Sequence, residues 1–255
     1  MASTLHDQLL QRLGTRIVGG DLPPGTVLHA ERLAQEQGVS RPVVREAVRV
    51  LQAMGLVAAT KRVGISVLPP ERWNLFDPLV IRWRLSAGSS GGQLRSMTEL
   101  RSAFEPKAAE LAALHRDDRD AARLLDLAVE MRDIGRAGDL ARFLELDIAF
   151  HRFVLAASGN EMMAQLDRMV AEVLTARTVQ GLMPHHPHED ALALHLRVAE
   201  SIWARDPGEA YAAMDRIMRR TAAEVSQTWS QLPRPAILPV PDEPAQLRSR
   251  SGADA

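Results

Sequence analysis

Cysteine is absent from the 255-residue sequence. Disulfide bonds, thiol nucleophiles and zinc sites built on thiolates are therefore excluded. The sequence also lacks any apolar run that approaches the roughly 20 residues of a membrane-spanning helix. Its first residues show no secretion signal, because Asp7, Gln8 and Gln11 interrupt the apolar pattern early. We expect a cytoplasmic protein without a membrane-embedded part.

Net charge is also small, at −1 for the whole sequence, so the total does not indicate a polyanionic partner. The charges are unevenly distributed, however. Residues 1–70 carry eight lysines and arginines against five acids, a net of +3, which leaves −4 for the remainder. A basic segment joined to a mildly acidic one is typical of a DNA-binding unit attached to a sensing unit.

Hydrophobic spacing predicts three helices and a β-hairpin within residues 1–70. The expected elements are helices over 5–17, 31–37 and 41–54, and strands over 56–60 and 65–68. The second helix stops at Gly38, and Ser40 follows it with a hydroxyl that can cap the third helix. Two short helices joined by a tight turn and followed by a hairpin predict a winged helix-turn-helix.

The third of these helices presents three arginines on one face. Arg41, Arg45 and Arg49 are spaced four residues apart, opposite the apolar stripe. Arginine reads guanine through O6 and N7 in the major groove, or holds phosphates. The alternative is a solvated helix face whose arginines pair with Glu46 and its neighbours. The preceding turn and the basic hairpin favour DNA binding.

The segment PPGTVLHAERLAQEQGVSRPVVREAVRVLQAMGLV (23–57) resembles the GntR family of bacterial regulators, most specifically in Ser-Arg-Pro-x-Val-Arg-Glu-Ala (40–47). The resemblance implies that the three arginines approach operator DNA. It also implies a phosphate contact by Arg32 and a grip on the flanking groove by the wing around Gly64. Lys61 and Arg62 lie at the hairpin tip and Ser40 at the helix start, and we assign all of these residues to DNA binding.

The rest of the chain is expected to be helical. Residues 71–92 are predicted to form a connector and a glycine/serine linker, which begins at Ser86 and cannot pack a core. Residues 93–232 show helical periodicity with several breaks, which predicts an all-helical bundle of about six to seven helices. Residues 233–255 contain five prolines and little apolar matter, so we expect a disordered tail. The fold class is therefore mainly α.

Polar residues occur in this second unit where periodicity demands apolar ones. Asp147 and His151 lie four residues apart in one apolar stripe, and His195 lies in another. Arg101 borders a third stripe near the start of the unit. Burying such groups costs several kcal/mol unless they pair or bind something. They form either an internal ion-pair network or a ligand site.

Three segments, TELRSAFEPKAAELAA (98–113), LDIAFHRFVLAASGN (146–160) and HLRVAESIWARDPGEAYAAM (195–214), resemble the FCD effector domain of the FadR subfamily. The resemblance implies a cavity that binds a carboxylate, often through a metal held by one aspartate and three histidines. Asp147, His151 and His195 match three of these ligands, and Ile217 occupies the place of the fourth. The site holds either a divalent metal, for which zinc is expected, or no metal. Arg101 matches the arginine that clamps the effector carboxylate.

The connector WNLFDPLVIRW (73–83) resembles a signature of the branch of this subfamily that senses sugar acids. We therefore expect a homodimeric repressor of a sugar-acid operon, released from DNA by a carboxylate such as galactonate or gluconate. The alternatives are a regulator that responds to another organic acid and a metal-dependent enzyme that acts on a small carboxylate. The sequence lacks HExxH, a nucleophile elbow and a phosphate-binding glycine loop, so we do not expect an enzyme.

Overall fold

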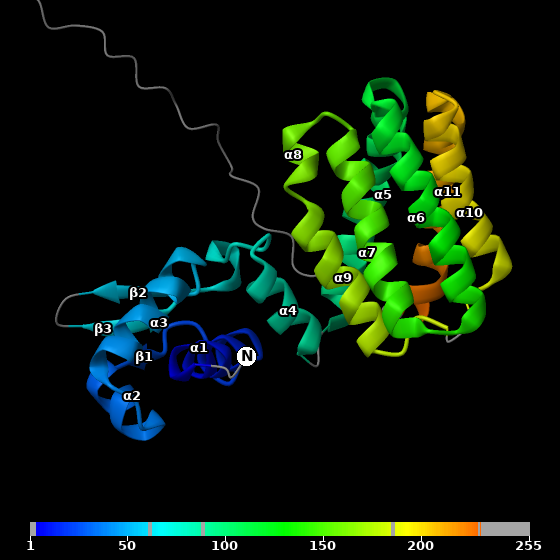
Figure 1. Cartoon of the computed structure of the whole chain (residues 1–255). Helices are drawn as coiled ribbons and strands as arrows, with labels where there is room; N and C mark the ends of the chain where they lie inside the picture. The colour runs from blue at the N-terminus through cyan, green and yellow to red at the C-terminus, as the bar shows by residue number, and fades with distance from the viewer. Residues whose placement is uncertain (1–3, 61–62, 88–89, 185–186, 229, 231–255) are drawn as a thin grey trace, which may run out of the picture.

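The computed structural model describes residues 4–60, 63–87, 90–184, 187–228 and 230. The chain is mainly helical, with a small sheet confined to its amino-terminal unit (Figure 1). A helical bundle follows, and helix α4 lies between the two (Figure 1). Within these ranges, no helix is both long enough and apolar enough to cross a membrane.

The amino-terminal unit has the arrangement of a winged helix-turn-helix, which confirms the prediction. Its elements are α1 (Leu5–Val18), β1 (Val27–Leu28), α2 (Ala30–Gln37), α3 (Arg41–Ala53), β2 (Val57–Thr60) and β3 (Gly64–Val67). Strand β3 pairs antiparallel with both β2 and β1. The sequence predicted the hairpin but not β1, because two residues are too few to show an alternating pattern.

The turn between α2 and α3 depends on two local features. Gly38 ends α2 with a φ of 63°, a left-handed conformation that glycine adopts without steric cost. Ser40 occupies the N-cap position of α3, as predicted, but its hydroxyl makes no capping hydrogen bond. Pro42 follows two residues later and has no amide hydrogen, which removes one of the two donors that such a cap uses. The predicted capping interaction is therefore wrong, although the helix begins where expected.

The connector contains a helix, as predicted. A 3₁₀ turn (Pro70–Arg72) leads to α4 (Pro78–Ser86), which Asp77 caps through its side chain. The predicted linker through residue 92 is wrong, because α5 already begins at Ser90. Glycine is tolerated at a helix end, and the buried side chains of Leu94 and Met97 hold this first part of α5 against the core.

Helix α4 contributes to two separate cores. Val80 and Trp83 are buried with the amino-terminal unit, whereas Ile81 and Leu85 are buried with the bundle. The Trp83 ring lies directly against Gly14 of α1, where even a methyl group would clash with it. This helix is therefore a rigid connection between the two units.

The carboxyl-terminal unit is an all-helical bundle, which confirms the prediction of six to seven helices. Its helices are α5 (Ser90–His115), α6 (Asp118–Ala137), α7 (Leu140–Ala157), α8 (Glu161–Ala164), α9 (Asp167–Val179), α10 (Glu189–Trp203) and α11 (Pro207–Val225). A 3₁₀ turn (Ser226–Thr228) follows. The bundle surrounds one continuous apolar core. The predicted tail, 233–255, lies outside the described residues.

Candidate functional site

The predicted DNA-binding arginines share the solvent-exposed face of α3. Arg41, Arg45 and Arg49 are exposed, whereas the opposite face of the helix is buried in the unit's core. Arg41 forms an exposed ion pair with Glu31, 3.0 Å away. Within the described part of the chain, Arg45 and Arg49 form no ion pair, so the alternative pairing with Glu46 is not found there.

The other predicted DNA contacts are more scattered. Arg32 on α2 is exposed and donates to Glu36 over 2.6 Å. Ser40 is exposed at the start of α3, and Gly64 begins β3 with a φ of 120°. Lys61 and Arg62 lie outside the described residues. The placed residues share the amino-terminal unit, but no interaction joins them into one site.

The bundle contains a pocket in which the predicted polar residues converge. Arg101 on α5, Asp147 and His151 on α7, and His195 on α10 all line it. All four are buried, and the pocket encloses about 520 Å³ of space, its open mouth included. Ile217 on α11 also lines the pocket, so an apolar side chain occupies the place that the resemblance gives to a third histidine.

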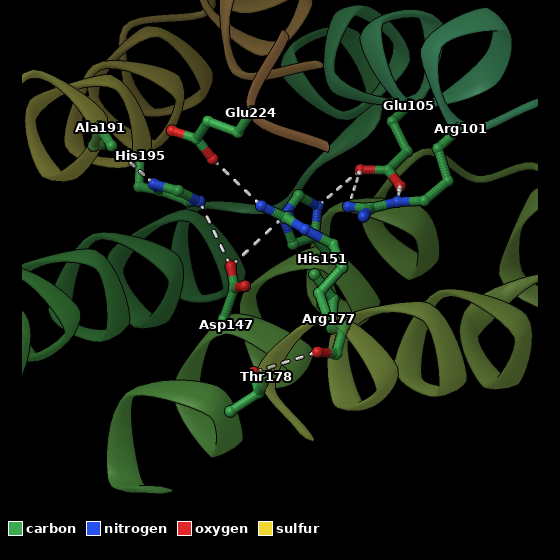
Figure 2. Close-up of polar contacts among 10 residues, drawn as sticks. Arg101, Glu105, Asp147, His151, Arg177, Thr178, Ala191, His195 and Glu224 are labelled. Atoms are coloured by element: carbon green, nitrogen blue, oxygen red, sulfur yellow. Dashed lines mark hydrogen bonds and ion pairs between the residues drawn. The ribbon is translucent and has the colours of Figure 1, made fainter. Parts of the chain in front are cut away.

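His195 and Asp147 face each other in an unusual way. The Nδ1 atom of His195 lies 2.8 Å from the Ala191 carbonyl, which can only accept, so Nδ1 carries the proton. In the neutral ring, Nε2 is then an acceptor, and it lies 3.3 Å from Asp147 Oδ1, another acceptor (Figure 2). Both atoms are buried, and no described group forms a hydrogen bond with either. Such a contact is favourable only with a cation between the two atoms, which either a metal ion or a second proton on the imidazole supplies.

His151 completes the group around that position. Its Nε2 atom lies 3.4 Å from the same Asp147 oxygen. One ligand atom from each of Asp147, His151 and His195 lies within 4.8 Å of the other two. Two imidazole nitrogens and a carboxylate oxygen are a donor set that binds divalent transition metals, and zinc among them. The residues present therefore fit a metal ion.

Glu105 is a member of the site that the sequence did not reveal. It is buried on α5, where Arg101 Nε donates to it over 2.5 Å, and its Oε2 lies 2.6 Å from His151 Nδ1 (Figure 2). The latter contact is close but poorly aligned, so it acts as an ion pair more than as a linear hydrogen bond. The spacing of Arg101 and Glu105, four residues apart in an apolar stripe, is the signal that could have identified it.

Opposite charges in the cluster stabilise one another and shift the pKa values of their neighbours. Burial alone would raise the pKa of Glu105, but Arg101 and His151 outweigh it and lower that pKa to about 2. Burial likewise opposes a charge on His151, but Glu105 and Asp147 outweigh it and raise the pKa of His151 to about 9. Burial would also raise the pKa of Asp147, yet its two histidine neighbours hold it well below the usual range. Both carboxylates are therefore ionised at neutral pH.

Arg177 and Glu224 are two further members that the sequence did not indicate. Figure 2 shows Arg177 reaching from α9 into the centre of the cluster, where its Nη2 lies 3.2 Å from Glu224 Oε2 of α11. The Arg177 side chain is 4% exposed and that of Glu224 is 29% exposed. Arg177 lies in the last turn of its helix, where a basic residue is common for helix-dipole reasons alone, so no sequence signal distinguished it.

The two interpretations of the cluster both have a basis in the structure. Arg101 is engaged by Glu105 through Nε and Nη2, as the ion-pair alternative expected, and only its Nη1 has no described partner. By contrast, Asp147 Oδ1 and His195 Nε2 are buried without a described hydrogen-bond partner, as the ligand-site alternative expected. The cluster is therefore an ion-pair network around a group of ligand atoms, two of which have no described hydrogen bond.

Comparisons with known proteins agree with this architecture. Residues 5–67 match the family described as bacterial regulatory proteins, gntR family, and residues 96–220 match the FCD domain. The chain is 32% identical over 171 residues to the galactonate operon transcriptional repressor of Escherichia coli K12, covering 67% of this chain and 74% of that protein. It is 30% identical over 204 residues to the transcriptional regulator LutR of Bacillus subtilis 168, covering 78% of this chain and 90% of that protein.

A solved structure shows the same fold. It is that of the Listeria monocytogenes protein Lar, described as controlling expression of the agr system, with a TM-score of 0.54 and 20% identity over 89% of this chain and 99% of that one. The matched relatives regulate transcription and are not enzymes, which confirms that prediction. The chain belongs to the gntR family of bacterial regulatory proteins and is a transcriptional regulator that joins a winged helix-turn-helix to an FCD domain.

Proposed function

We propose that this regulator represses a sugar-acid catabolic operon in the cytoplasm and that a hydroxycarboxylate of the galactonate or gluconate class releases it from DNA. The observation that carries the proposal is the buried pocket in which three potential metal ligands and two arginines converge. The name of the galactonate relative supports the effector class, as does the resemblance of residues 73–83 to sugar-acid sensors. The pocket supplies both cationic groups for a carboxylate and polar atoms for hydroxyls.

The operator is contacted by the exposed side of the amino-terminal unit. Helix α3 enters the major groove, and its neighbours hold the backbone and the flanking groove. The proposed contacts are Arg32, Ser40, Arg41, Arg45, Arg49, Lys61, Arg62 and Gly64. One recognition helix reads only a few base pairs, so specific binding requires a homodimer on two half-sites of a symmetric operator.

The pocket residues Asp147, His151 and His195 would hold a divalent ion, for which we propose zinc. Bound there, the ion supplies a Lewis acid that attracts ligand oxygens. The chain orients the donors: the Ala191 carbonyl fixes the His195 ring, and Glu105 holds His151 through Nδ1. Three protein ligands leave coordination positions for the oxygens of a hydroxycarboxylate.

A second candidate binds the acid in the same pocket without a metal. With a pKa of about 9, His151 is protonated at neutral pH, and its positive charge offsets that of Asp147. The acid would then be held by side chains alone. Metal content separates the two candidates.

Helix α9 connects the pocket to the amino-terminal unit. Its Arg177 lines the pocket, while Glu172 of this helix pairs with Arg82 of α4. Gln180, which directly follows α9, donates to the Leu85 carbonyl of α4 over 2.9 Å. A ligand that moves α9 therefore moves α4, which is buried in both cores. We infer that this movement changes the spacing of the two recognition helices in the dimer, so effector and operator oppose each other.

Replacing Arg45 tests the proposed recognition face. Arg45→Ala should weaken operator binding by about 1–3 kcal/mol and relax base preference, because a guanine contact is lost. Fluorescence anisotropy with labelled operator at fixed salt measures the change. Arg123→Ala is the control, because Arg123 is equally an exposed arginine but lies on α6 of the bundle. Equal affinity of Arg45→Ala and Arg123→Ala would show that α3 does not read the operator.

Metal analysis of protein dialysed against zinc tests the metal site. Wild type and His188→Ala should each retain about one zinc per chain, whereas His195→Ala should retain none, because zinc needs its imidazole. His188 is a suitable control because it lines the same pocket but is exposed. Glu105→Gln should weaken zinc binding by about 10- to 100-fold, since the orientation of His151 is lost. Stoichiometric zinc in His195→Ala would refute the site, and zinc-free wild type would favour the metal-free candidate.

Operator release tests the proposed effector class. Galactonate or gluconate, added to the complex of wild type with operator, should raise the Kd for DNA by about 5- to 150-fold, the usual range of coupling between two sites. Galactitol, which keeps the hydroxyls and lacks the carboxylate, should have no effect. An operator affinity that no acid of this class alters would contradict the proposed function.

A further inference from the structure

The guanidinium of Arg177 has a buried N–H donor without a described hydrogen-bond partner. Only Nη2 has a described partner, Glu224 Oε2 at 3.2 Å, and Nε is buried without one. The Nε and Nη2 atoms lie on the same edge of the guanidinium, the edge that can hold both oxygens of a carboxylate in parallel. Glu224 therefore occupies half of a two-point carboxylate site.

The corresponding edge of Arg101 is filled. Glu105 accepts from Nε at 2.5 Å and lies 3.4 Å from Nη2, and both residues are only 1% exposed. A ligand could therefore reach Arg101 through Nη1 alone. Of the two buried arginines that line the pocket, only Arg177 has an edge that a ligand carboxylate could take over completely.

The Glu224 side chain is placed so that it can move away from Arg177. It is 29% exposed at the pocket wall, in contrast to the 4% of Arg177. It also accepts from Arg220 Nε over 2.9 Å, and Arg220 is four residues away on the same helix. Glu224 would keep this cationic partner after releasing Arg177. Arg177 cannot leave in the same way: burial and Arg101 lower its pKa, while Asp147 and Glu224 oppose that shift, so its charge depends on these anions.

We propose that Arg177 is the arginine that binds the effector carboxylate and that Glu224 is a built-in competitor, which occupies the place of that carboxylate until the effector displaces it. This inference rests on the proposed function and adds to it the residue that selects an anion and the residue that sets its affinity. Displacement breaks a contact between α11 and α9, and α9 is the helix that holds α4. The exchange of one carboxylate for another is therefore the local event that the amino-terminal unit senses.

Removing the competitor should tighten binding. Glu224→Gln keeps the shape of the side chain but removes its charge, so the apparent affinity for an acid should rise about tenfold as the competing state is lost. Glu209→Gln is a closely matched control: Glu209 is also on α11, accepts from two arginines, Arg197 and Arg216, and is 28% exposed. It lies in the first turn of the helix rather than near the pocket, so its change should leave acid binding unaltered.

The test is calorimetric titration of the full chain with galactonate, gluconate and galactarate, in parallel with operator binding. Arg177→Lys and Arg177→Gln should lose affinity by about 10- to 100-fold, because lysine keeps the charge but not the two-point geometry. If Arg177→Gln does not fold, the double variant Arg177→Gln/Glu224→Gln removes the unpaired carboxylate and serves in its place. Melting temperatures verify folding of every variant.

The outcomes separate this inference from the proposed function. Tighter binding by Glu224→Gln, with weaker binding by Arg177→Lys, supports the inference, and so does an acid that binds only Glu224→Gln. If an acid binds wild type and releases operator but Glu224→Gln behaves like Glu209→Gln, the inference is wrong and the proposed function stands. If acids bind as the inference expects without affecting operator, only the proposed function fails. If no acid binds wild type or Glu224→Gln, both are wrong.

Discussion

Two buried atoms that face each other without a hydrogen bond, Asp147 Oδ1 and His195 Nε2, impose the main constraint on the bundle. They lie 3.3 Å apart in the helical bundle, and the described residues give neither a hydrogen bond. The neighbouring charges offset the cost of burying them. His151 and Arg177 place positive charge near Asp147, and Glu105 stabilises the charge on His151. Burying such groups costs free energy unless they are paired, which is why we propose that the pocket binds a ligand.

The second constraint is mechanical. Helix α4 is buried in the cores of both units, and α9 holds it while lining the pocket with its other face. Well-packed cores transmit small displacements rather than absorbing them. We therefore expect a change of partner at Arg177 to displace α9 and, with it, α4. An ion pair and a hydrogen bond join α4 to α9 and the residue that follows it.

The sequence predicted what depends on local spacing. The period of apolar residues identified the helices of both units, and the four-residue spacing of Arg41, Arg45 and Arg49 put them on one exposed face. Asp147, His151 and His195 were identified because they interrupt apolar stripes, and the structure does bring them together.

Features that depend on long-range packing were not predicted. Strand β1 is fixed by pairing with β3 rather than by its own two residues, and α5 starts within the expected linker because its buried side chains pack on the core. Arg177 and Glu224 acquire their roles only where α9 meets α11, 47 residues apart in the chain. Neither residue interrupts an apolar stripe in a way that the sequence alone could reveal.

The central claim, that a cation and a carboxylate share this pocket, has one direct measurement. Crystals of the full chain, grown with zinc and galactonate, should give an anomalous difference peak at the zinc edge, within about 2.0–2.2 Å of ligand atoms from Asp147, His151 and His195. Galactonate oxygens should complete the coordination, and its carboxylate should lie on Arg177 in place of Glu224. A pocket with bound galactonate and no anomalous peak, in which His195 Nε2 instead accepts a hydrogen bond from a ligand hydroxyl, would contradict the claim.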